Sequence, residues 1–155
     1  MLPVVLTQAV VRSLDWLAVR VLRPDPRPRH QQTGSKGEED AYFYLRKRGY
    51  VVVARNYRTP QCRGEIDLIG WDADVLCFIE VKTRTSRDVK PAEAAVDRHK
   101  RREIAAVARG YLRHQPLSCQ WRFDIVSVYY ERQYSRPQIE VIQNASLSGQ
   151  DSYLR

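Results

Sequence analysis

The chain has 155 residues, of which 43% are hydrophobic and 28% charged, the proportions of one ordinary globular domain. This composition excludes a collagen, a long disordered protein and a membrane channel. The net charge of +8 indicates an anionic partner, either nucleic acid or an acidic membrane surface. The three cysteines and three histidines lack the spacing of a disulfide framework or a zinc site, which favours a reducing compartment.

Residues 1–33 are expected to form an N-terminal appendage. Residues 4–22 have the pattern of an amphipathic helix, which would pack on the domain or on a partner, and a linker rich in proline and arginine follows. No basic residue precedes the first apolar run, and no apolar stretch reaches the ~18 residues of a membrane span. We therefore expect a cytoplasmic protein. Binding of the helix to a membrane surface is the less favoured interpretation, because its polar face has too few basic residues.

Residues 34–143 are predicted to form one mixed α/β domain, and residues 144–155 a polar tail. The capping-box pattern Ser35-x-x-Glu38 predicts a helix over residues 35–49, and Pro91 predicts the start of a longer helix that ends near residue 114. Strands are predicted over residues 50–58, 65–70, 75–83, 123–130 and 139–142, the last at a sheet edge.

The strand over residues 75–83 carries two charged side chains at its end. It is apolar on both faces up to Ile79, which predicts a central position in the sheet. Because side chains alternate along a strand, Glu80 and Lys82 share one face. They would pair with each other, lie beyond the sheet edge, or belong to a functional site.

Asp67 lies between two aliphatic residues of the preceding strand, an unusual place for an acid. If the two strands form a hairpin with an even loop, paired residue numbers sum to 147 and Asp67 faces Glu80. Two facing carboxylates repel, and a divalent cation such as Mg²⁺ would relieve the repulsion. The alternative is a solvated acid near a hairpin.

Two further charged residues are candidates for the same site. Glu38 shares a helix face with apolar residues, so it either points inward or returns to the backbone of Ser35. Lys100 falls within the apolar stripe of the long helix and either reaches solvent or enters a site. The segment 82–113 carries ten Lys or Arg against four Asp or Glu, a surface suited to a polyanion.

An ordered set of motifs resembles a known family. The spacing from Asp67 to Glu80-Val81-Lys82 resembles the PD-(D/E)XK motif of the restriction-endonuclease-like superfamily, with Ile66 in place of the motif's proline. More closely, residues 34–142 resemble the bacterial YraN-like family, which is related to archaeal Holliday junction resolvases. The further motifs are Gly34-x-x-Gly37-Glu38-x-x-Ala41, Arg55-Asn56-Tyr57-Arg58, Gly64-Glu65-Ile66-Asp67-Leu68-Ile69, Phe78-Ile79-Glu80-Val81-Lys82-Thr83-Arg84, Lys100 on the long helix, and Arg122-Phe123-Asp124-Ile125-Val126.

The resemblance implies a restriction-endonuclease-like central mixed sheet flanked by helices, and a metal-dependent endonuclease acting on branched or single-stranded DNA in repair or recombination. Asp67, Glu80 and the backbone carbonyl of Val81 would bind Mg²⁺ or Mn²⁺, Lys82 would orient the attacking water or stabilise negative charge, and Glu38 matches the first-helix acid of the resolvases. The residues expected to contact phosphates are Arg84, Lys100, Arg101 and Arg102.

Two alternatives to a nuclease remain at this point. A non-catalytic nucleic-acid-binding module on the same fold would bind without metal and with a steep dependence on salt. An adaptor that acts through the N-terminal helix would lose function without residues 1–32. For the nuclease and for the binding module, the expected partner is nucleic acid, with DNA favoured over RNA. The related resolvases act as two-fold dimers because a junction offers two scissile strands, which leaves a homodimer open.

Overall fold

The computed structural model describes residues 28–85, 96, 98–131 and 136–145. The chain divides into two units between Gln32 and Thr33, and the fold below is that of the unit beginning at Thr33. The predicted helix over residues 4–22, the predicted helix start at Pro91 and residues 146–155 of the tail lie outside the described residues. Among the residues that are described, no helix has the length and apolar character needed to cross a membrane.

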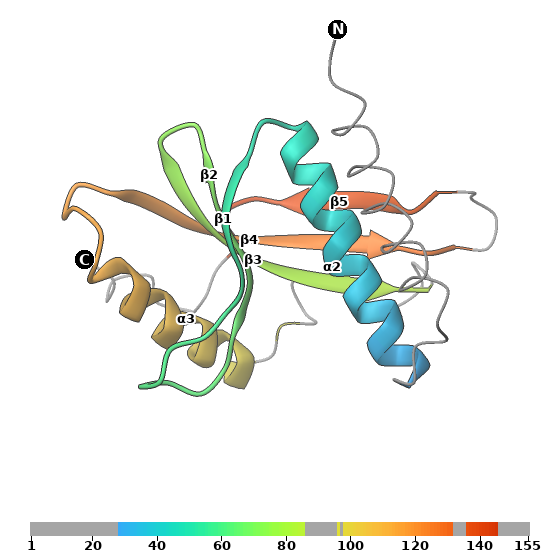
Figure 1. Cartoon of the computed structure of the whole chain (residues 1–155), viewed down its shortest axis with the longest axis horizontal. Coiled ribbons are helices and arrows are strands. Elements are labelled where there is room, and N and C mark those ends of the chain that lie inside the picture. Colours follow the sequence, from blue (N-terminus) through green and yellow to red (C-terminus); the bar gives the residue numbers. More distant parts are fainter. Residues whose placement is uncertain (1–27, 86–95, 97, 132–135, 146–155) are drawn as a thin grey trace, which may run out of the picture. The chain divides into compact units, whose positions relative to one another are not determined.

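Five strands form one mixed sheet in the order β1-β2-β3-β4-β5 (Figure 1). Neighbouring strands are antiparallel except β3 and β4, which are parallel and are joined by a connection that contains α3 (Arg98–Leu112). This arrangement confirms the predicted mixed sheet and its edge strand near residue 140. The strands are β1 (Val51–Tyr57), β2 (Ile66–Asp72), β3 (Val75–Arg84), β4 (Gln120–Tyr129) and β5 (Gln138–Ile142).

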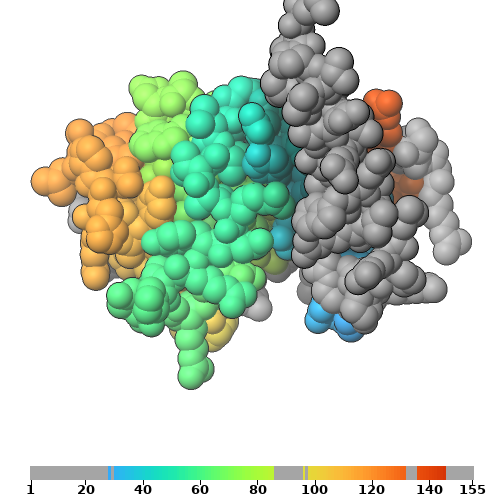
Figure 2. Space-filling view, in the orientation of Figure 1, coloured from blue at the N-terminus to red at the C-terminus, as the bar shows by residue number. Residues whose placement is uncertain are grey.

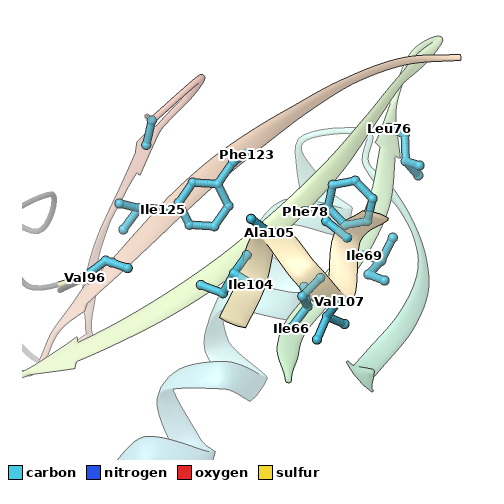
Figure 3. Close-up of a cluster of buried hydrophobic side chains, with 12 residues drawn as sticks. Ile66, Ile69, Leu76, Phe78, Val96, Ile104, Ala105, Val107, Phe123 and Ile125 are labelled. Carbon is cyan, nitrogen blue, oxygen red and sulfur yellow. The ribbon is translucent and has the colours of Figure 1, made fainter. Parts of the chain in front are cut away.

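The central strand β3 is buried on both faces, as its sequence predicts. On one face Phe78 belongs to an apolar cluster with Ile104 of α3 (Figure 3). On the other face Ile79 belongs to a second cluster with Leu45 of α2 (Arg29–Lys47). Full burial of one such side chain contributes about 1.5–3 kcal/mol. The two clusters therefore hold the two helices on opposite faces of the sheet.

The start of α2 differs from the sequence prediction. The helix begins at Arg29 and not at Ser35. The N–H groups of Gln31 and Gln32 donate hydrogen bonds to the carbonyl of Pro28, so the helix starts directly after this proline. Ser35 consequently lies inside the helix, and the predicted capping box at its start is wrong.

The end of α2 agrees with the prediction of a stop at Gly49. Gly49 has a φ of 93°, the left-handed conformation that glycine adopts without strain. Its N–H donates to the carbonyl of Arg46, and the N–H of Tyr50 donates to the carbonyl of Leu45. These two bonds form a Schellman motif, which satisfies the last helical carbonyls.

The β2–β3 hairpin has the predicted register. Asp72 pairs with Val75, and Leu68 pairs with Ile79, so the residue numbers of each pair sum to 147. A two-residue loop fixes this register because it leaves no freedom to slip. The hairpin therefore brings the ends of β2 and β3 that carry the acids to the same place.

Candidate active site

Asp67 lies where β2 separates from β3. Main-chain pairing stops at Leu68 and Ile79, so the expected direct pairing of Asp67 with Glu80 does not form. Instead the side chain of Asp67 provides the acceptor that a main-chain carbonyl of β2 would otherwise provide. Its Oδ2 accepts a hydrogen bond of 2.7 Å from the N–H of Val81. The N–H and C=O of one residue in a strand point to the same edge, so the Val81 carbonyl is also directed toward β2.

Glu80 is buried between two lysines. Its side chain is only 3% exposed and shares the α3 face of the sheet with Phe78. Its Oε1 lies 2.9 Å from Nζ of Lys82, and its Oε2 lies 3.5 Å from Nζ of Lys100. This confirms that Glu80 and Lys82 share a face and pair, and it shows that Lys100 reaches inward. A buried carboxylate needs such partners because desolvation of its charge is costly.

The electrostatics of Asp67 reflect its burial beside a second acid. Burial raises the pKa of Asp67 to about 7, and repulsion by Glu80 acts in the same direction. The hydrogen bond from Val81 and the positive charge of Lys100 lower this pKa. Near neutral pH the carboxyl group of Asp67 is therefore only partly ionised, and an additional positive charge beside it would favour its ionised form.

Glu38 lies on α2, next to a glycine that contacts β3. The preceding residue, Gly37, touches β3 so closely that a β-carbon there would overlap Oγ1 of Thr83. The negative charge of Glu38 also raises the pKa of Asp67, so the two carboxylates are close enough to interact. Because α2 begins at Arg29, Ser35 is not a helix cap and Glu38 has no capping box to close, while its negative charge acts on Asp67.

The four predicted phosphate ligands lie in different surroundings. Lys100 joins the acids, whereas Arg101 donates a hydrogen bond of 2.8 Å to the carbonyl of Val96. Arg102 is exposed on α3. Arg84 ends β3, and its Nε and Nη2 are buried without a hydrogen-bond partner in the described part of the chain. Of these four, Lys100 is shown in contact with a candidate acid, Glu80.

A second polar cluster lies on the opposite face of the sheet. Asp124 is fully buried, and its register partner Ile79 places it on the α2 face. It accepts two bonds of 3.0 Å from Nε of Arg122 and one of 2.9 Å from the N–H of Asn144. Arg122 also pairs with Asp72 at 2.6 Å. Asp124 is thus a buried acid whose carboxylate is held by these partners.

The ligands available for a metal are two carboxylates and a carbonyl. In residues 28–85, 96, 98–131 and 136–145, no group of three or more His, Cys, Asp or Glu side chains is arranged to hold a metal ion. The remaining set is Asp67, Glu80 and the Val81 carbonyl, and Oε2 of Glu80 is buried without a hydrogen bond. Mg²⁺ usually takes only one or two protein carboxylates and completes its shell with water and phosphate, so this set fits it.

Sequence reasoning missed one group of residues beside these acids. The connection between β1 and β2 carries Arg58, Arg63 and Glu65, and these three residues lie around Lys100 of α3. Arg58 belongs to the Arg55-Asn56-Tyr57-Arg58 motif, for which the sequence analysis predicts no role. The signal that could have found the group is the presence of two arginines in a short connection directly before the Asp67 strand.

Comparisons with known proteins place the chain in a family. The model of the uncharacterised protein family UPF0102 matches residues 37–128, a range that includes Glu38, Asp67, Glu80 and Lys82. A UPF0102 protein of Koribacter versatilis (strain Ellin345) is 51% identical over 144 residues, which cover 92% of this chain and 96% of that protein.

Two other relatives support the same grouping. A UPF0102 protein of Solibacter usitatus (strain Ellin6076) is 48% identical over 115 residues, covering 72% of this chain and 83% of that protein. A UPF0102 protein of Chlorobaculum tepidum is 42% identical over 126 residues, covering 77% of this chain and 95% of that protein. The chain therefore belongs to the uncharacterised protein family UPF0102, the YraN-like family that its sequence resembles.

Proposed function

We propose that this protein is a cytoplasmic, metal-dependent endonuclease with a restriction-endonuclease-like fold, and that it cuts branched or single-stranded DNA in repair or recombination. One observation carries the proposal. The carboxylates of Asp67 and Glu80 meet beside the main chain of Val81, where β2 leaves β3, and Lys82 lies 2.9 Å from Glu80. A fold has little need to bury two repelling acids at one point unless a cation or a reaction uses them.

The proposed chemistry is phosphodiester hydrolysis. Asp67, Glu80 and the Val81 carbonyl would hold Mg²⁺ or Mn²⁺, which when bound polarises a phosphoryl oxygen and lowers the pKa of water. Lys82 would stabilise the negative charge that develops on the phosphoryl group, because its ammonium is held at the acids by Glu80. Glu38 would add a third carboxylate at the edge of the site.

A non-catalytic nucleic-acid-binding module is the second candidate, and one observation favours it. Lys82 and Lys100 each approach a different oxygen of Glu80, so its charge is compensated without a metal. In such a module the acids would serve to position the lysines for phosphate contacts. Binding would then be independent of metal and would weaken steeply with salt.

Cleavage assays with matched variants separate the two candidates. Labelled duplex, single-stranded and four-way-junction DNA would be incubated with the protein in Mg²⁺, Mn²⁺ or EDTA. Asp67→Asn is the informative variant, because asparagine can still accept the hydrogen bond from Val81 while the charge is lost. Asp74→Asn, in the exposed turn between β2 and β3, is the control for removal of a carboxylate.

The expected result is metal-dependent cleavage by the wild type and by Asp74→Asn, and its loss in Asp67→Asn. Lys82→Ala should also reduce the rate, by about 10²–10³ if it stabilises the transition state. Cleavage that persists in Asp67→Asn would refute the proposed site. Metal-independent binding without cleavage, unchanged in Asp67→Asn, would establish the binding module instead.

A further inference from the structure

An open hollow of about 380 Å³ lies beside the candidate acids and has no part in the chemistry proposed above. Its walls come from the connection between β1 and β2, residues 58–65, and from Lys100 near the start of α3. Figure 2 shows this connection, coloured green, at the surface of the domain. The hollow is therefore open to a ligand that lies across the face of the protein.

The connection is fixed along α3 at three points. A β-carbon at Gly64, whose φ is +101°, would lie only 2.8 Å from Cβ of Glu103, so the main chain touches the helix there. Farther along α3, a β-carbon at Gly110 would lie 3.4 Å from Cγ2 of Thr59. At the other end, nearer the start of α3, Nζ of Lys100 donates to the carbonyl of Glu65 at 3.4 Å. The walls are thus held in place before a ligand binds, which reduces the entropy lost on binding.

The lining is strongly positive. Arg58, Arg63 and Lys100 contribute three cations, against the single carboxylate of Glu65. Glu65 pairs with Arg58 through Nη2 at 2.5 Å and so orients that guanidinium. Within the described part of the chain, Arg63 makes no ion pair. An arginine fork of this kind matches the geometry of a phosphate group, which accepts two parallel hydrogen bonds.

Lys100 connects the hollow to the candidate active site. Its Nζ contributes to the lining and also lies 3.5 Å from Oε2 of Glu80. Successive phosphates of a nucleic-acid strand are joined through a single sugar, so they are only one nucleotide apart along the backbone. A nucleic-acid strand with one phosphate at the acids would therefore have a neighbouring phosphate within reach of the hollow.

We propose that this hollow, with Arg63 as its principal contact, binds a phosphate group of the substrate strand adjacent to the phosphate at Asp67 and Glu80. The inference rests on the proposed function, because it assumes a nucleic-acid strand at those acids. Its role is to position the strand. The phosphate is either a terminal phosphomonoester or an internal phosphodiester, and both have the chemistry that arginine recognises.

Binding measured without metal tests the site. Fluorescence anisotropy of one labelled single strand, in its 5′-phosphorylated and 5′-hydroxyl forms, would be recorded in EDTA over a series of salt concentrations with the full chain. Arg63→Ala is the test variant because it breaks no ion pair of the described fold, whereas Arg58→Ala would remove the partner of Glu65. Arg113→Ala, an exposed arginine just beyond the end of α3, is the matched control for the loss of one positive charge.

Arg63→Ala should bind severalfold more weakly than Arg113→Ala, and its salt dependence should be shallower by about 0.7, the value for one lost phosphate contact on a single strand. A loss confined to the 5′-phosphorylated strand assigns a terminal phosphate, and a loss for both strands assigns an internal one. Equal binding by Arg63→Ala and Arg113→Ala would overturn the site.

The two proposals fail in different experiments. If the wild type cleaves with Mg²⁺ but Arg63→Ala binds like its control, only the phosphate site is wrong. If the wild type never cleaves but Arg63→Ala binds more weakly than the control, the phosphate site stands and the nuclease is wrong.

Discussion

The carboxyl group of Asp67 has a cost for stability that follows from its raised pKa. The unfolded pKa is about 3.9, whereas burial raises that of the folded protein to about 7. The penalty is absent below the unfolded pKa, grows as the pH rises and is complete above the folded pKa. Asp67→Asn should therefore stabilise the metal-free protein, and more at pH 8 than at pH 5.

Urea unfolding in EDTA at the two pH values measures this effect. Asp74→Asn serves again as the control, because this substitution also removes one carboxylate, but at an exposed position. A gain in the free energy of unfolding of Asp67→Asn that is equal at both pH values would contradict the assignment of a raised pKa to Asp67.

Metal binding should reverse the same penalty. A cation that binds the folded protein raises its Tm by mass action, and binding to Asp67 requires the ionised carboxylate. We expect Mg²⁺ or Mn²⁺ to raise the Tm of the wild type, and to do so more strongly above the pKa of about 7 than below it. Thermal unfolding with and without EDTA would show this, and Asp67→Asn should not respond. A response to metal that survives Asp67→Asn would place the metal elsewhere.

At the scale of single elements, two glycines of α2 make a matched pair. A β-carbon at Gly37 would overlap Thr83 of β3, whereas one at Gly34 would meet nothing within 4 Å. Gly37→Ala should therefore destabilise the protein by about 1–3 kcal/mol through overpacking. Gly34→Ala should stabilise it by about 0.5–1 kcal/mol, because alanine is the better helix former. Free energies of unfolding of the two variants, measured in urea, should have opposite signs relative to the wild type.

The elements also show what the sequence can and cannot predict. The hairpin register was predictable because a short even loop and alternating side chains both specify it. The start of α2 was not predicted, because the capping pattern at Ser35 is a local signal. Residues 30–34 contain no proline, so nothing interrupts the helix there. It therefore extends toward the N-terminus as far as Pro28 and begins directly after this residue.

At the scale of the whole domain, the buried cluster around Asp124 joins distant parts of the chain. Arg122 bonds to Asp124, to Asp72 at the end of β2 and to the hydroxyl of Tyr50 just after α2. Asp124→Ala would leave Arg122 short of a buried partner and should lower the free energy of unfolding by about 3–5 kcal/mol. The rise in Tm on adding Mg²⁺ should persist, since Asp124 lies on the other face of the sheet from Glu80.

Such a cluster could not be predicted from the sequence, for a physical reason. Asp72 and Arg122 are 50 residues apart, and neither the hydrophobic period nor local spacing indicates that they meet. The proximity of Asp67 and Glu80 was predictable because one hairpin carries both residues. Whether Lys100 and Glu38 reach those acids could not be predicted from the sequence, since it depends on how each helix packs on the sheet.

The hairpin that carries both acids has a consequence for the order of folding. Asp67 and Glu80 are separated by only twelve residues, so they approach through one short loop closure, a fast local event. We expect Lys100 to reach the acids later, because the parallel pairing of β3 with β4 requires the whole crossover with α3. The repulsion between the acids thus opposes the earliest step, before a lysine from α3 compensates it. If the hairpin is formed in the transition state, Asp67→Asn should accelerate refolding in EDTA more than it slows unfolding.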